Sequence, residues 1–218
     1  MSLTRSGPIT RNAQSVALGL AKILVGPVDL DVSGTPAIEL TAQVLNETTG
    51  SMGAMAATNF VSEIEYWKLE SGFPMLEDFS IPLRESARLE CEFKEVTLRN
   101  LAIARGIDAD TEDYPHALIA GPGQEDTINL GAIKAPDYVR MEAIYTYPDQ
   151  QNRMIIVFPR ANVTSSMELT LAAEDNANVP ITFEAKRADS GVDGVTTEVW
   201  DDAPLGKIFF EAVSSTSP

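Results

Sequence analysis

Few residues of this chain have the types and spacing that chemistry requires, and the most suggestive are four acids close together. Asp108, Asp110, Glu112 and Asp113 have the spacing with which a calcium-binding loop begins. That loop needs glycine at its sixth position, where Asp113 stands, and glutamate at its twelfth, where Ile119 stands. We therefore expect an exposed acidic loop here and predict no metal site.

The other candidates for catalysis or cofactor binding are also incomplete. With Cys91 as its only cysteine and His116 as its only histidine, the chain lacks the ligands of an ordinary tetrahedral zinc site. No local signature joins these two residues into a nucleophilic pair. Gly206 and Lys207 end a segment that lacks the first glycine and the hydroxyl of a phosphate-binding loop. The sequence predicts a protein that is not an enzyme and that holds no cofactor.

The element that would position polar side chains is a strand followed by a short helix, at residues 79–106. From residue 87 to residue 94 apolar and polar side chains alternate, which is typical of a strand with one buried and one wet face. The apolar side holds Ala87, Leu89, Cys91 and Phe93, and the polar side holds Arg88, Glu90, Glu92 and Lys94. Cys91 is therefore expected to be a small core residue.

A short helix is predicted over about residues 97–106. Apolar residues recur there at three- and four-residue spacing, which replaces the alternation of the preceding strand. Thr97 is a suitable N-cap, and Gly106 stands where a helix would end in a left-handed turn.

The rest of the chain consists of short apolar segments separated by Gly, Pro, Asn and Asp, a pattern typical of strands and turns. Predicted strands lie at residues 17–30, 38–45, 60–70, 117–120, 127–133, 139–147, 154–158, 166–172, 180–186, 195–200 and 208–213. Short strands with almost no helix predict a mainly β fold, an antiparallel β-sandwich or barrel with one short flanking helix.

The domain organisation follows from composition. A single β domain is expected at residues 16–213, after a flexible N-terminal arm at residues 1–15 and before a disordered tail at residues 214–218. Residues 46–58 are small and nearly uncharged, which is typical of a long loop. The longest apolar run, residues 16–28, is too short to span a bilayer, so no membrane segment is predicted.

The charge of the chain is strongly negative and unevenly distributed. There are 32 acidic and 16 basic residues, a net charge of −16. Residues 1–35 carry three basic and two acidic residues, a net of +1, so the remainder carries −17. A body this negative repels nucleic-acid phosphate, which disfavours sequence-specific DNA binding. Two interpretations remain open: a solubilising surface, or a surface along which a polyanion passes without sticking.

The order of these segments resembles that of the tail tube (major tail) proteins of long-tailed bacteriophages. LGLAKILVGPVD at residues 18–29 resembles the opening strand of that family, and the glutamate-rich segment at residues 60–72 resembles its next long strand. Residues 86–93, followed by TLRNLAIARG at residues 97–106, resemble its next strand and its helix. The resemblance covers roughly residues 16–107 and is one of pattern and order.

This resemblance implies a structural virion protein. Family members self-assemble into stacked, hexameric rings that form the tail tube, through which DNA passes without specific binding during ejection. The implied partners are other copies of the chain and further tail proteins: tape measure, terminator, baseplate and, as a further candidate, sheath. The chain would be made in the cytoplasm of the bacterial host and would reside in the tail of the virion.

Two sets of candidate residues follow from the resemblance. The polar sides of two strands would line the lumen; an ordinary solvated strand face explains the same alternation equally well. These candidates are Glu63, Glu65, Arg88, Glu90, Glu92 and Lys94. The N-terminal arm and the loop at residues 46–58 would order on contact with the next ring, with Thr49, Met52 and Met55 as candidate ring-stacking residues.

Alternative functions stay open at the level of sequence. A neck, terminator or baseplate-ring protein, or the tube protein of a secretion system, would share the same fold. A carbohydrate- or receptor-binding β-sandwich would use Trp67, Trp200, or Tyr145 and Tyr147 as its platform.

Overall fold

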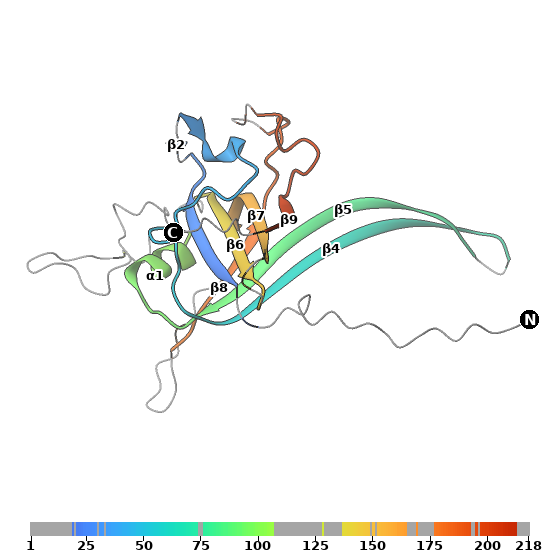
Figure 1. Ribbon diagram of the computed structural model, residues 1–218. Coiled ribbons are helices and arrows are strands. Elements are labelled where there is room, and N and C mark those ends of the chain that lie inside the picture. The colour runs from blue at the N-terminus through green and yellow to red at the C-terminus, as the bar shows by residue number, and fades with distance from the viewer. Residues whose placement is uncertain are drawn as a thin grey trace, which may run out of the picture.

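The computed structural model describes residues 19, 21–29, 31–32, 34–73, 76–106, 128, 137–148, 150, 152–164, 169, 177–192, 195 and 197–212. In this part the chain is mainly antiparallel β-sheet with one short α-helix, which confirms the predicted fold class (Figure 1). The elements are β1 (Lys22–Pro27), β2 (Asp31–Val32), β3 (Thr35–Pro36), η2 (Ala37–Glu39), β4 (Met55–Ser71), β5 (Leu76–Phe93), α1 (Leu98–Ala104), β6 (Val139–Thr146), β7 (Asn152–Val163), β8 (Val179–Ala185) and β9 (Lys207–Ala212).

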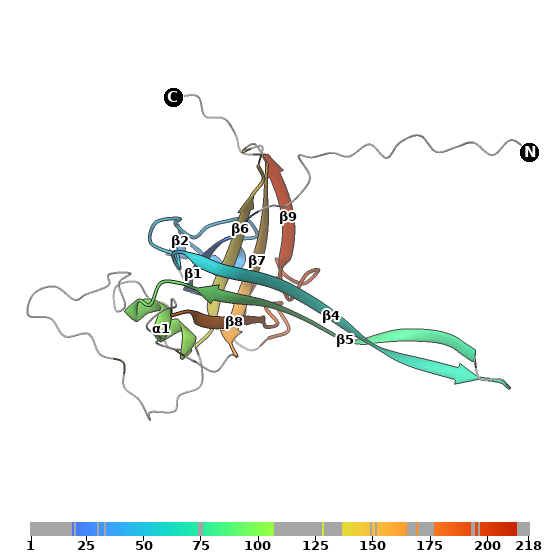
Figure 2. The ribbon, with the colours of Figure 1, turned by 90° about the horizontal axis from the view of Figure 1, so that it is seen from below.

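The main sheet has seven strands and folds over on itself. Its order is β1-β6-β7-β8-β5-β4, and β9 pairs with β7 outside this path. β7 makes the fold possible because its first half, residues 152–157, pairs with β9, and its end, residues 161–163, pairs with β8. Figure 2 shows the result: β4, β5 and β8 run across β6, β7 and β9 as a second layer. In such packings, one strand commonly passes from the first layer to the second and so belongs to both.

The space between the two layers holds the larger apolar core. Leu89, Phe93 and Phe183 from one layer and Met141 and Ile156 from the other belong to this cluster, and all are buried. Phe60 of β4 reaches Phe158 of β7 with ring centroids 6.4 Å apart, although their strands are not neighbours in the sheet. Apolar burial from both layers provides most of the driving force for this fold.

A second apolar cluster covers the opposite face of β6 and β7. It is formed by Leu24, Leu45, Ile144, Ile155, Val157, Ala188 and Trp200. Because Trp200 is fully buried there and its indole N–H donates to the carbonyl of Ile38, η2 and the residues next to it are held against the sheet.

A buried ion pair fixes the same segment. Arg140 and Glu142 of β6 are both fully buried, with Nε and Oε1 2.8 Å apart. The guanidinium of Arg140 donates to the carbonyls of Ala37, Leu40 and Ala42, at 2.9 Å for Leu40 and 2.8 Å for Ala42. The carboxylate of Glu142 accepts from the amide of Leu45 at 3.1 Å. Residues 38–45 were predicted to be a strand; this is wrong, because side chains of β6 satisfy their backbone groups.

The predictions for the strand and helix at residues 87–106 are confirmed. Ala87, Leu89, Cys91 and Phe93 are buried, as the alternation requires. The side chain of Thr97 accepts from the amide of Asn100 at 3.2 Å, so Thr97 is the N-cap of α1. Gly106 has φ of +69°, the left-handed conformation expected after the helix.

Among the other predicted segments, those at residues 139–147, 154–158, 180–186 and 208–213 are confirmed as β6, β7, β8 and β9. The segment at residues 195–200 is not a strand, since residues 199–202 form a turn. The N-terminal arm, the tail at residues 214–218, and almost all of the segments at 117–120, 127–133 and 166–172 lie outside the described residues. Of the described helices, none has the length and apolarity to cross a membrane.

Candidate functional site

The distinctive feature of the fold is a long hairpin that leaves the body. β5 pairs with β8 only from Arg88 to Phe93, so its earlier residues have β4 as their sole partner strand. Both strands continue well beyond the packed layers (Figures 1 and 2). We call residues 62–73 and 76–85 the projecting hairpin. Every side chain that is described in it is exposed.

One face of the projecting hairpin is apolar. Trp67 lies opposite Ile81, and Leu69 lies opposite Phe79. Cross-strand partners, and residues two apart on a strand, share a face of the ribbon. The four side chains therefore lie together, although 36–48% of each is exposed. Trp67 and Phe79 make an edge-on ring contact, with centroids 5.9 Å apart.

A β-bulge divides this apolar segment from the base of the hairpin. The pairing register shifts between Glu65 and Tyr66, where Leu83 is left without a direct partner.

The alternation at residues 60–70 predicts one protected and one wet face. The structure instead exposes Ile64 and Tyr66 as well as Trp67, because no second layer covers the ribbon there. An isolated two-stranded ribbon is at best marginally stable in water.

The polar side of β5 holds most of the predicted lumen residues, and it lies on the same face of the ribbon that carries Trp67 and Leu69 farther out, since these two continue the alternation of Glu63 and Glu65 on β4. Arg88, Glu90 and Glu92 lie on this face, away from the core residues between them. Glu63 and Glu65 lie opposite Ser86 and Arg84, on the same side of the ribbon. Lys94 follows the end of β5 and is exposed. The structure thus brings five of the six candidates onto one face.

Ion pairs join several of these residues. Nη1 of Arg88 lies 3.2 Å from Oε1 of Glu63, and its Nε lies 2.9 Å from Oε1 of Glu90. Glu90 also accepts from the amide nitrogen of Asn59 at 3.0 Å. The hydrogen bond with Glu90 raises the pKa of Arg88, and the same bond lowers the pKa of Glu90. All of these groups are accessible to solvent, so the ion pairs orient the side chains on this face but contribute little to the free energy of folding.

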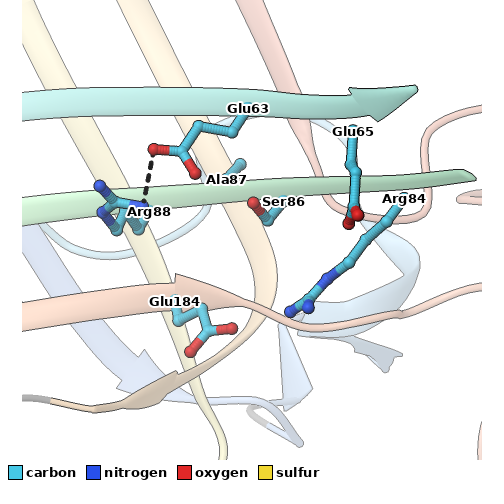
Figure 3. A pocket seen from close by; sticks show the side chains of 7 residues that line it. All are labelled: Glu63, Glu65, Arg84, Ser86, Ala87, Arg88 and Glu184. Atoms are coloured by element: carbon cyan, nitrogen blue, oxygen red, sulfur yellow. Dashed lines mark ion pairs between the residues drawn. The ribbon is translucent and has the colours of Figure 1, made fainter. Parts of the chain in front are cut away.

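A hollow of about 300 Å³ lies at the base of the projecting hairpin, where β4, β5 and β8 come together (Figure 3). It is lined by Glu63, Glu65, Arg84, Ser86, Ala87, Arg88 and Glu184. Figure 3 shows carboxylates and guanidinium groups facing one another across it. Without a histidine, cysteine or apolar floor, this lining has neither a nucleophile–base pair nor the apolar character of a small-molecule site.

The loop predicted at residues 46–58 ends at Ala54, because β4 begins at Met55, and the loop that remains, with Thr49 and Met52, is tied to the body. The amide of Val25 donates to the carbonyl of Gly50 at 2.9 Å, and the amide of Met52 donates to the carbonyl of Ile23 at 3.0 Å. Met52 and Met55 are buried, whereas Thr49 is exposed. A stacking role of this loop would therefore depend on Thr49 and its exposed neighbours.

Arg99 of α1 holds this loop in place, and no local sequence signal indicates it. Its side chain is fully buried and donates to the carbonyls of Thr49 and Val25, at 2.6 Å for Val25. Asn100 beside it donates to the carbonyl of Met52 at 3.0 Å. Burial lowers the pKa of Arg99. Three segments distant in sequence thus meet at one turn of helix.

The features that would support other functions are weak in the described part of the chain. Burial raises the pKa of Cys91 to about 12, so its thiol is not a nucleophile at neutral pH. Trp200 and Tyr145 are buried, which leaves Trp67 as the exposed member of the proposed carbohydrate platform. No group of three metal-binding side chains occurs among the described residues. The acids at 108–113 and His116 lie outside them.

Comparison with known proteins adds two distant likenesses. No family model matches the chain, and no curated protein matches it in sequence. A chain of the sheath–tube complex of the PVC extracellular contractile injection system, in its extended state, has a TM-score of 0.37 and 12% identity, and the match covers 95% of this chain and 100% of that one. The cap that terminates the tube of the anti-feeding prophage has a TM-score of 0.37 and 8% identity, covering 98% of this chain and 100% of that one. At these identities and TM-scores the likenesses do not indicate a function for this chain.

Proposed function

We propose that the chain is a structural subunit that assembles with copies of itself into rings, and that the rings stack into a tube. The observation that carries this proposal is the projecting hairpin. It exposes eight large apolar side chains on a ribbon that no second layer of the described residues covers. Such a surface on an otherwise well-packed protein is typical of an interface. The sequence resemblance to phage tail tube proteins supports the same function.

The finer parts of the proposal come from that resemblance. The rings would be hexameric, the tube would belong to a virion tail, and DNA would pass through it during ejection. Tape measure, terminator and baseplate proteins would be its partners. No catalytic step is proposed.

The polar face of β5 would line the tube. Glu63, Glu65, Glu90 and Glu92 outnumber Arg84, Arg88 and Lys94 on it, and residues 36–218 together carry −17. A negative wall would repel phosphate and let DNA slide. An image of the assembled ring that places these side chains on its outer wall would contradict this assignment.

The test is self-assembly of the purified chain. Negative-stain microscopy and size-exclusion chromatography over a concentration series should show rings or tubes. The double variant Trp67→Ser/Ile81→Ser should remain folded, because both positions are exposed in the single chain, yet it should no longer assemble. The matched control is Val199→Ser, which alters an exposed apolar side chain outside the projecting hairpin.

Three results would contradict the proposal or redirect it. A wild-type chain that stays monomeric over the whole concentration range would overturn self-assembly. Closed single rings that never stack would favour a neck or terminator protein of the same fold. Glycan binding that is lost on Trp67→Ser would favour the carbohydrate-binding alternative.

A further inference from the structure

The projecting hairpin needs an apolar surface to dock on, and we infer that this surface is β9 of a second copy of the chain. This inference deepens the proposed self-assembly and rests on it. It concerns which part of the neighbouring subunit receives the hairpin.

The hairpin's apolar area is a substantial part of what an interface between two copies requires. Its eight exposed large side chains are Ile64, Tyr66, Trp67, Leu69, Phe73, Phe79, Ile81 and Leu83. A half-exposed aromatic side chain contributes roughly 100 Å² and an aliphatic one less, so the eight present several hundred Å², divided between the two faces of the ribbon. A stable protein interface buries about 800 Å² on each partner. Contact of one face with a second copy would therefore supply part of such an interface.

β9 is the apolar surface that remains on the described body. Outside the projecting hairpin, the exposed large apolar residues are Tyr138, Val199, Ile208 and Phe210. Tyr138 is covered by Arg160, whose guanidinium carbon lies 3.8 Å from the ring centroid, and Val199 stands alone. Ile208 and Phe210 lie two residues apart on one strand, so their side chains share a face.

The geometry of β9 suits it to receive a partner. Ile208 lies opposite Ile156 of β7, and Phe210 lies opposite Met154. Ile156 belongs to the core between the layers, so this face of β9 extends the core's apolar surface to the edge of the body. Yet 47% of Ile208 and 68% of Phe210 are exposed. β9 pairs with β7 alone among the described strands, which leaves its outer edge open.

The hairpin of the same chain does not cover this strand. β9 lies in the body next to β7, whereas the outer half of the projecting hairpin points away from the body in both views (Figures 1 and 2). A contact between the hairpin of one copy and β9 of the next joins two different surfaces. Such a contact repeats from subunit to subunit and closes into a ring when the rotation allows.

Site-directed cross-linking tests this contact. Chains that carry Ile81→Cys and differently tagged chains that carry Phe210→Cys are mixed and oxidised under assembly conditions. We expect a disulfide between the two tags. Val199→Cys in place of Phe210→Cys is the control and should give no such product. Cys91 is buried and does not compete.

Substitution of β9 separates this inference from the proposed function. Ile208→Ser/Phe210→Ser should lower the pelleted or polymerised fraction by roughly tenfold or more, as expected for central residues of an interface, with an unchanged thermal midpoint. Normal assembly of this variant, alongside failed assembly of Trp67→Ser/Ile81→Ser, would overturn the role of β9 and leave self-assembly standing. A disulfide formed within one chain that carries both cysteines, or a wild-type chain that never assembles, would also overturn the inference.

Discussion

The two halves of β5 show how one strand serves two environments. In the body, β5 is flanked by β4 and β8, and its alternate side chains are almost completely buried: Leu89 is 1% exposed and Phe93 is 0% exposed. In the projecting hairpin the same strand has one partner and its described side chains are exposed, including Phe79 and Ile81. The body buries its own apolar side chains, whereas those of the projecting hairpin are left exposed. Under the proposed function, the β8-paired half of β5 contributes to the stability of the chain and the projecting half contributes to assembly.

The sharpest stability effect is expected in the body, at the buried ion pair. Glu142→Gln removes the charge that compensates Arg140 and weakens the hold on the segment up to Leu45. Breaking one partner of a buried pair costs about 3–5 kcal/mol, and we expect a loss of this size in urea unfolding. Glu90→Gln on the solvated face is the control and should leave the midpoint unchanged. Equal effects of the two substitutions would contradict the difference between a buried and a solvated ion pair.

A matched pair of phenylalanines compares the two regions directly. Phe183→Ala empties a site in the core, where the side chain is fully buried, and should cost about 3–5 kcal/mol of unfolding free energy. Phe79→Ala in the projecting hairpin should change the stability of the monomer by less than about 0.5 kcal/mol. Chemical denaturation at low protein concentration measures both. A large loss for Phe79→Ala would mean that the hairpin stabilises the single chain.

The smallest effect is expected at the surface of the body and depends on pH. A hydrogen bond with Lys22 lowers the pKa of Glu47 below its ordinary value of 4.5, and Oε2 of Glu47 lies 3.0 Å from Nζ of Lys22. The ionised form is therefore favoured by folding. Its contribution is present above pH 4.5 and is lost as the pH falls through the lowered value.

Lys22→Met should therefore be less stable than wild type by under about 1 kcal/mol at pH 7, since the pair is half exposed. This difference should shrink at acidic pH, as Glu47 becomes protonated in both proteins. Urea midpoints at neutral and at acidic pH measure it. A difference that grows on acidification would contradict the assignment.

Local patterns in the sequence were sufficient for some elements. The alternation around Cys91, the N-cap Thr97 and the left-handed Gly106 are each decided by neighbouring residues, and all three predictions are confirmed. The placement of Arg88, Glu90 and Glu92 on one face follows from the same alternation. Whether that face lines a tube stays a prediction.

Long-range contacts account for what sequence reasoning missed. The segment at residues 38–45 has strand-like composition, but its backbone is held by Arg140, about a hundred residues away along the chain. Met52 is buried because β1 and α1 bind its loop. Strands were predicted at residues 60–70 and from residue 79, but no local pattern indicates that β4 and β5 pair along their whole length and project from the body; Pro82 is tolerated there because it lies next to a bulge.

Hydrogen exchange in the dilute and assembled states tests the central claim most directly. Amides of β6, β7 and the β8-paired half of β5 should be protected in both states, since they lie in the packed layers. Amides of the projecting hairpin should exchange quickly in the dilute monomer and become protected in the assembly. Equal protection of the hairpin in both states would contradict the view that another copy of the chain covers it.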